Sequence, residues 1–217
     1  MSDTCESVRP SAPETEARPK PLPPSGNFLG MDLEMSQPGG EVVQIGAGVM
    51  HLPTGELLER LNVYVQIGKP MDYRTMLLTG IDDDILLREG GTLLEGYHAL
   101  VSLHRRHRCF INGIEWGNDF RYLRERLGDE IKDEGWAFGR RTVDVKTLYV
   151  EWRRANNENT KSGLSKSMAK GGLQFLGRKH HADDDAVNTL RRWRRMLELL
   201  RRDPTQSFPP ANTTGQK

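Results

Sequence analysis

The order of the structural signals along the sequence predicts an α/β fold with a sheet of mixed direction. Three strand-like segments come first, and helical and strand-like segments then alternate. A final helical segment carries its apolar residues on one stripe, which is typical of a helix that packs on a sheet or on other helices. Consecutive strands followed by alternating helices and strands predict an α/β sheet in which the strands do not all run the same way.

The first three strands are predicted from apolar runs and turn residues. Residues 28–35 and 41–50 form two apolar runs separated by a Gln-Pro-Gly-Gly turn at 37–40, and we expect them to pair as a hairpin. A Pro-Thr-Gly turn at 53–55 leads to residues 61–67, in which every second residue is apolar. This period of two predicts a third, half-buried strand.

The second half of the sequence predicts helices with short strands between them. Apolar residues at helical spacing indicate a helix over about 93–104, and residues 108–112 indicate a strand directly after it. A helix over 119–127, a short strand over 141–145 and helices over 146–154 and 183–202 follow. The last helix carries six arginines on its polar face, which predicts a solvated surface, with phosphate contact as the alternative: Arg191, Arg192, Arg194, Arg195, Arg201 and Arg202.

Length and composition indicate one domain with polar tails. Of the 217 residues, 1–26 form a Pro-rich arm that we expect to be disordered, and 204–217 form a flexible tail. The domain is therefore predicted to span residues 27–203. No apolar run is long enough for a membrane span, and residues 1–27 have no secretory pattern. Cys5 and Cys109 offer neither a disulfide framework nor a CxxC site, which suits a reducing cytoplasm.

Asp32 and Glu34 are the most unusual pair in the sequence. They lie two residues apart in a segment that otherwise predicts a buried strand, so both carboxylates point to the same face. Two buried like charges either force one group to protonate or require a cation between them, and Mg²⁺ and Mn²⁺ prefer carboxylate oxygens. The alternative is a strand near the sheet edge with both acids in water.

A second cluster of polar residues lies at the start of the last helix. His180 precedes Asp185 by five residues, and three consecutive aspartates begin at Asp183. Aspartates at this position also cap the helix, and we interpret Asp183 and Asp184 in this way. His181 is expected to face solvent or a phosphate. His180 with Asp185 supplies a proton acceptor and a metal ligand.

A third candidate is Asp119, which follows Trp116 and begins a predicted helix. Its carboxylate is favoured in the first turn, because a negative charge interacts favourably with the positive N-terminal end of the helix dipole. A simple capping role is the alternative. Trp116 can stack on a nucleic-acid base or pack in the core.

Asp32-x-Glu34, Asp119 and His180-x4-Asp185 together resemble the DEDDh group of 3′-to-5′ exonucleases in the RNase H-like superfamily. The resemblance covers about residues 28–200. It includes the Thr-Gly-Ile segment at 79–81 and a Thr-Val-Asp-Val strand at 142–145. It also includes residues 162–164 and 176–178, which lead up to the final His180-x4-Asp185 motif. The sister DEDDy group would have Tyr where this chain has His181. The sequence is similar both to exonucleases that trim histone mRNA and small interfering RNA and to oligoribonuclease.

The resemblance implies a mixed five-stranded sheet flanked by helices and a specific assignment of roles. Two Mg²⁺ or Mn²⁺ ions would be held by Asp32, Glu34, Asp119 and Asp185, and His180 would take a proton from the attacking water. The wall against the terminal nucleotide would be formed by five residues: Leu78, Thr79, Gly80, Ile81 and Trp116.

The resemblance also implies the substrate. Single-stranded RNA or DNA 3′ ends are expected, RNA being favoured, with nucleoside 5′-monophosphates as products. A DNA-proofreading exonuclease and a non-catalytic nucleic-acid-binding module on the same fold are the alternatives. The expected protein partner is a second copy of the chain or a targeting protein.

Overall fold

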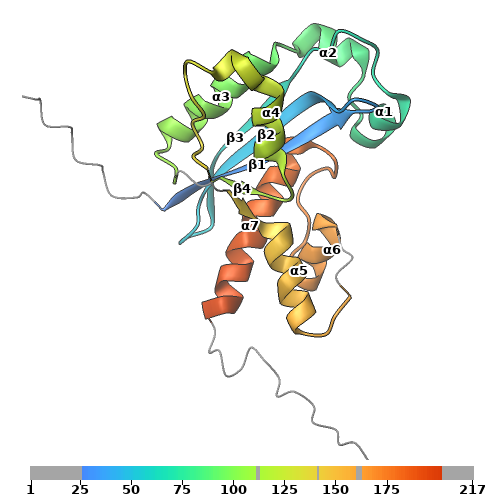
Figure 1. The fold of residues 1–217 in the computed structure, drawn as a ribbon. Coiled ribbons are helices and arrows are strands. Elements are labelled where there is room, and N and C mark those ends of the chain that lie inside the picture. The colour runs from blue at the N-terminus through green and yellow to red at the C-terminus, as the bar shows by residue number, and fades with distance from the viewer. Residues whose placement is uncertain (1–25, 111–112, 141, 160–162, 202–217) are drawn as a thin grey trace, which may run out of the picture.

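The computed structural model describes residues 26–110, 113–140, 142–159 and 163–201. Within these residues the chain forms one five-stranded sheet with helices on both faces (Figure 1). The strands are β1 (Asn27–Ser36), β2 (Glu41–His51), β3 (Glu56–Tyr64), β4 (Ile114–Glu115) and β5 (Val143–Asp144). The helices are α1 (Tyr73–Thr79), α2 (Asp83–Glu89), α3 (Leu93–Arg106), α4 (Asp119–Leu127), the 3₁₀ turn η1 (Gly128–Ile131), α5 (Val145–Ala155), α6 (Leu164–Lys170) and α7 (Ala182–Arg201).

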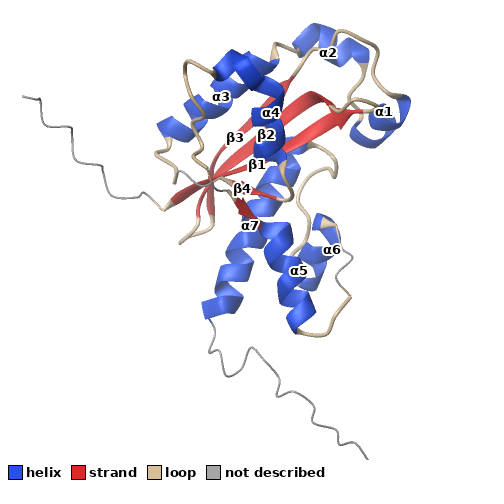
Figure 2. Ribbon diagram, in the orientation of Figure 1, coloured by secondary structure: helices blue, strands red, loops and turns tan. Residues whose placement is uncertain are grey.

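The strand order is β3-β2-β1-β4-β5, with β1 at the centre (Figure 2). β1 and β3 each pair with β2 in the antiparallel direction, whereas β4 is parallel to β1 and β5 is parallel to β4. The predicted mixed five-stranded sheet flanked by helices is therefore confirmed.

The two faces of the sheet are covered by different helices because side chains alternate along each strand. Leu33 of β1 and Ile45 of β2 belong to the cluster that includes Tyr97 of α3 and Phe120 of α4. The opposite face carries Asp32 and Glu34, and α7 packs there against β1 and β2. The alternation of side chains along β1 thus separates a core face from the face that carries the acids.

Two glycines allow α7 to lie close to the sheet. A Cβ atom at Gly46 would overlap the backbone of Ala182, and one at Gly30 would lie 2.8 Å from the carbonyl oxygen of Ala186. Gly46 is the direct partner of Asp32 in the β1–β2 ladder. The first turn of α7 is therefore held beside the carboxylates of β1.

Two predicted strands differ in position from the observed ones. The third strand begins at Glu56 rather than at residue 61 and ends at Tyr64, because Val65 leaves the ladder with β2 and forms a bridge with Gly91. The strand predicted at 108–112 is displaced to β4, since residues 108–110 follow α3 as a turn and a stretch without regular secondary structure. Residues 111 and 112 of that prediction lie outside the described residues.

The arginines of α7 do not form the uniformly solvated face that the sequence predicts. Arg192 is only 1 % exposed, and its guanidinium lies 4.7 Å from the ring centroid of Tyr149 on α5. Arg194 and Arg195 donate hydrogen bonds to the carbonyl oxygens of Leu52 and Gly171. These arginines are engaged because α5, the turn after β2 and the end of α6 all lie against α7.

Residues 1–25 of the predicted arm and the predicted tail at 204–217 lie outside the described residues. In the part of the chain that the structure describes, no helix combines the length and apolarity needed to cross a membrane.

Candidate active site

Carboxylates from β1 and α7 line a common cavity. Asp32 and Glu34 project from the α7 side of β1, and Asp185 projects from the first turn of α7. Together with His180, they line a cavity of about 620 Å³. Asp32, Glu34 and Asp185 are half-buried, whereas His180 is exposed. The structure thus brings together four of the five residues predicted to act in catalysis.

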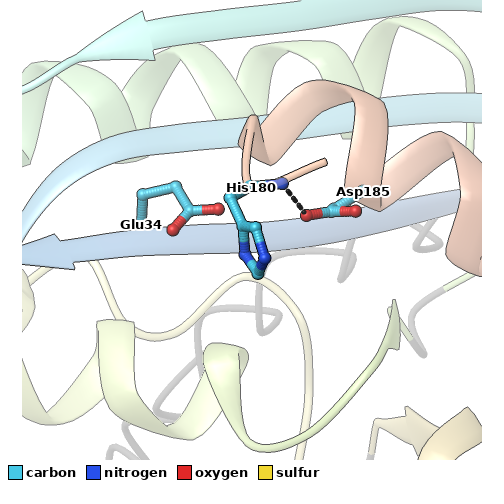
Figure 3. A group of neighbouring side chains, drawn as sticks. All are labelled: Glu34, His180 and Asp185. Carbon is cyan, nitrogen blue, oxygen red and sulfur yellow. Dashed lines mark hydrogen bonds between the residues drawn. The ribbon is translucent and has the colours of Figure 1, made fainter. Parts of the chain in front are cut away.

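His180 is held beside Asp185 by its own backbone. Its N–H donates a hydrogen bond of 2.9 Å to Oδ2 of Asp185, and its φ of 59° makes a tight turn before α7. Ligand-type atoms of Glu34, His180 and Asp185 all lie within 4.8 Å of one another. Figure 3 shows these three side chains around one space, with the hydrogen bond between His180 and Asp185 as a dashed line.

A buried glutamine fixes the start of α7. Gln44 lies on β2 opposite Glu34, and its side chain is fully buried. Its Oε1 accepts a hydrogen bond of 3.0 Å from the N–H of Ala182, and its Nε2 donates one of 2.7 Å to Asn62. The first residue of α7 is thereby tied to the centre of the sheet, one turn before Asp185.

Asp119 acts on the same acids from α4, which packs against β1. It is the first residue of α4, and the next residue, Phe120, is buried in the core and donates its N–H to Oε2 of Glu115 at 2.9 Å. Asp119 is not among the residues that line the cavity, but its charge acts directly on Asp32. The structure therefore places all four predicted metal ligands in one electrostatic cluster.

The pKa values of these carboxyl groups are raised, mainly because the groups are buried. Burial raises the pKa of Asp32 well above its ordinary value, and the neighbouring carboxylates add to the shift. Burial likewise raises the pKa of Glu34 to about 7, with Asp185 adding to it, and that of Asp119 to about 8. The pKa of Asp185 is raised to about 6 by burial, against the opposing effect of the His180 N–H. Without a cation, the ionised forms repel one another.

This arrangement suits a hard divalent cation. The groups that face one another are carboxylate oxygens, and a positive charge among them would offset both their burial and their mutual repulsion. The cluster holds no cysteine, and its only histidine is His180 at the edge. Zinc, which favours sulfur and nitrogen ligands, is a poorer match to these donors.

Four of the five residues of the predicted nucleotide wall, Leu78 to Ile81, do not line the cavity. Leu78 is 53 % exposed, whereas the side chains of Thr79 and Ile81 are buried at the end of α1. Gly80 ends that helix at a φ of 72°, and the guanidinium of Arg178 packs against it and donates to the carbonyl oxygen of Thr79. The segment is therefore joined to the turn that carries His180 without lining the cavity.

Trp116 lies at the boundary between the cavity and the core. It lines the cavity, and its ring also lies 5.9 Å from that of Tyr149 in a core cluster.

His181 and the first two aspartates of α7 differ from their predicted roles. His181 is partly buried rather than facing solvent, and its Nδ1 lies 2.6 Å from Oδ1 of Asp183. Asp183 also pairs with Arg60 at 2.8 Å, and Asp184 accepts the N–H of Arg178 at 2.7 Å. These side chains hold the turn before α7 in place rather than capping free N–H groups within the helix.

Sequence reasoning gave no role to several residues of the site. Glu115 is buried and accepts a hydrogen bond from the N–H of Phe120. In the sequence, only its position directly before Trp116 could have marked it as part of the site. Lys166, Phe175 and Lys179 form another wall of the cavity. Their position depends on how α6 packs on α7, which the sequence does not display.

Comparison with solved structures supports the same fold. The nuclease domain of 3′hExo, a DEDDh family member bound to rAMP, matches 80% of this chain and 92% of its own length with a TM-score of 0.65 at 19% identity. A full-length 3′-exonuclease matches with a TM-score of 0.63 at 18% identity over 80% of this chain, which spans only 60% of that protein. Exonuclease I of E. coli in complex with a dT13 oligonucleotide gives 0.62 at 15% identity, covering 81% of this chain and 43% of its own.

No family model and no curated protein matches the sequence. At these identities the likeness establishes the arrangement of the chain in space. The chain has the RNase H-like fold of the DEDDh 3′-exonucleases, as the sequence predicts.

Proposed function

We propose that this protein is a divalent-metal-dependent 3′-to-5′ exonuclease that acts on single-stranded nucleic acid and releases nucleoside 5′-monophosphates. The observation that carries the proposal is the convergence of Asp32, Glu34 and Asp185 with His180 in one cavity. Asp119 belongs to the same electrostatic cluster. The fold shared with solved 3′-exonucleases supports the reaction class.

The carboxylates are proposed to hold two Mg²⁺ or Mn²⁺ ions. Asp32 has the central position, because the charges of Asp119, Asp185 and Glu34 all act on it. When bound, the ions would polarise the scissile phosphate and stabilise the charge that develops on the attacking and leaving oxygens. The chain's own part is to fix the carboxylates on β1, α4 and α7, which do not have to rearrange when substrate arrives.

His180 is proposed as the general base. An unprotonated ring nitrogen takes a proton from the water whose oxygen bonds to phosphorus, and the bond from phosphorus to the 3′-oxygen of the preceding nucleotide breaks. That oxygen takes a proton from solvent and becomes the new 3′-hydroxyl, while the phosphate stays on the released nucleotide. The exposure of His180 lets its proton pass on to solvent.

RNA is the favoured substrate, and the segment Leu78–Thr79–Gly80–Ile81 with Trp116 is proposed to receive the terminal nucleotide. Solved relatives of this fold include one bound to rAMP and one that recognises the 3′ end of a histone mRNA stem-loop. Exonuclease I with dT13 supports DNA as the second candidate.

Residues 27–203 are proposed as the catalytic domain, acting in the cytoplasm. A second copy of the chain or a targeting protein remains a proposed partner.

The proposal is tested by digesting RNA and DNA oligonucleotides of the same sequence, labelled at the 5′ end, in Mg²⁺ or Mn²⁺. We expect a ladder that shortens from the 3′ end, faster for RNA, and no reaction when the 3′-hydroxyl is blocked by a phosphorothioate-linked cap. Cleavage of circular strands at internal positions would overturn exonuclease action. Faster digestion of DNA, above all at mismatched ends, would favour the proofreading alternative.

Replacing His180 with Gln should lower kcat by about 10²–10⁴-fold, because the proton acceptor is lost while the carboxylates remain. KM should change little. Single-turnover kinetics over pH 5–9 provides the measurement. His98→Gln is the matched control, since His98 is exposed and pairs with Glu134 far from the cavity. A His180 variant as fast as the parent would remove His180 from the mechanism.

A further inference from the structure

The cavity has a second wall that carries positive charge. Asp32, Glu34 and Asp185 form its acidic part, and Lys166 of α6 and Lys179, which precedes His180, also line it. Both lysines are exposed. A cavity with carboxylates on one side and ammonium groups on another can hold metal ions and an anionic ligand at the same time.

Lys166 and Lys179 differ from Lys170 and Lys69, which form ion pairs with glutamates. Lys170 lies one turn after Lys166 on the same helix and pairs with Glu158 at 3.2 Å, and Lys69 pairs with Glu41 at 2.8 Å. Neither Lys166 nor Lys179 forms an ion pair with any described residue. Helix α6 therefore commits one lysine to the protein and presents another to the cavity.

An aromatic side chain completes this wall. Phe175 is half-buried and lines the cavity between α6 and the turn that carries His180. Single-stranded nucleic acids are typically bound by basic side chains that contact phosphates and by aromatic rings on which bases stack. Lys166, Lys179 and Phe175 provide both kinds of group in one place.

The position of this wall decides which nucleotide it receives. The Leu78–Ile81 segment, proposed for the 3′-terminal nucleotide, does not line the cavity, and Arg178 covers its glycine. The strand on the leaving side of the scissile phosphate therefore needs another surface, and the wall of Lys166, Lys179 and Phe175 adjoins the same carboxylates.

We propose that Lys166, Lys179 and Phe175 form a subsite for the nucleotide on the 5′ side of the scissile bond. Lys166 and Lys179 contact the phosphate one linkage upstream of the scissile phosphate, and Phe175 faces the adjoining base. This inference rests on the proposed function, because it assumes that the scissile phosphate lies at the carboxylates. It makes the enzyme prefer a strand with an upstream phosphate over a dinucleotide that lacks one.

Lys166 offers the cleanest test, because Lys179 is next to the proposed base. Octanucleotides are compared that carry either a phosphate or one neutral methylphosphonate at the linkage upstream of the scissile phosphate. The parent protein should cleave the phosphate form about tenfold faster at limiting substrate, the effect of one charge-assisted contact. Lys166→Ala should lose most of this preference and cleave the methylphosphonate form at the parent's rate. Lys170→Ala, on the same helix, should retain the parent's preference.

A binding measurement separates this inference from the proposed reaction. In an Asp32→Asn background, where the strand stays intact, the affinity of a fluorescent octanucleotide is measured against salt concentration. Lys166→Ala should reduce the slope of log affinity against log salt by about 0.7, the value for one phosphate contact on a single strand. Lys170→Ala should not change it.

The two measurements have distinct negative outcomes. If the parent protein cleaves the octanucleotide but Lys166→Ala retains both the preference and the salt slope, the subsite is wrong and the proposed function stands. If the salt slope depends on Lys166 but the parent protein cleaves no strand, Lys166 does contact a phosphate of the bound strand, but the proposed function is wrong and so is the placement of this contact beside a scissile bond.

Discussion

Replacing Asp32 with Asn should abolish nucleic-acid hydrolysis while leaving the fold intact. Asp32 is the carboxylate on which the other three act, so its loss removes the centre of the proposed ion-binding cluster. The charge stabilisation that bound metals supply in a transition state amounts to several kcal/mol. A loss of roughly 4 kcal/mol corresponds to about 10³-fold in rate, which a discontinuous assay of released nucleotide measures readily.

The same variant should be more stable than the parent when no divalent ion is present. The neutral amide has the shape of the carboxylate but does not repel Glu34 and Asp185. Asp129→Asn is the matched control, because Asp129 is exposed in η1 and does not line the cavity. It should change neither the rate nor the melting temperature. Full activity in Asp32→Asn would refute the assignment of the site.

Divalent ions should stabilise the folded protein, and more at pH 8 than at pH 5. The folded pKa values of Asp185, Glu34 and Asp119 are raised to about 6, 7 and 8 respectively. The folded chain thus binds protons more tightly than the unfolded chain, whose carboxyl groups titrate near pH 4. In the ion-free protein, stability should be greatest at about pH 4–5 and fall as the pH rises through 6–8.

A bound ion replaces those protons, so its effect should grow over the same pH range. An ion at 100 times its Kd adds about 2.7 kcal/mol, which is roughly 5–10 °C in Tm for a chain of this size. Thermal unfolding with Mn²⁺, Mg²⁺ or EDTA at each pH provides the measurement. The Asp119→Asn variant should show a weaker pH dependence in EDTA. A Tm that is independent of both ion and pH would show that these carboxylates do not share an ion site.

The central sheet and its acids could be predicted because local patterns determine them. The two-residue period of a strand places Asp32 and Glu34 on one face, and the sheet turns that face towards α7. The apolar stripe of the last helix likewise predicted a helix that packs on a sheet or on other helices, and α7 packs on β1 and β2. The mixed direction of the sheet followed from the order of the elements, independently of any single residue.

Features that depend on tertiary contacts could not be predicted. β4 has two residues, too few for a periodic signal, so the strand was expected at residues 108–112, before its observed position at Ile114–Glu115. Arg192 has the sequence context of a solvated face, but the ring of Tyr149 covers it where α5 meets α7. The wall that contains Lys166 exists only because α6 packs beside the carboxylates, and no spacing in the sequence links the two.

The most direct test of the central claim is the identity of the product. Purified full-length protein is incubated with a single-stranded RNA octamer in Mn²⁺, and the released nucleotides are separated by chromatography. Nucleoside 5′-monophosphates should accumulate with the parent protein, and neither EDTA-treated protein nor Asp32→Asn should release them. Release of nucleoside 3′-monophosphates, or equal release by the parent protein and Asp32→Asn, would contradict the account.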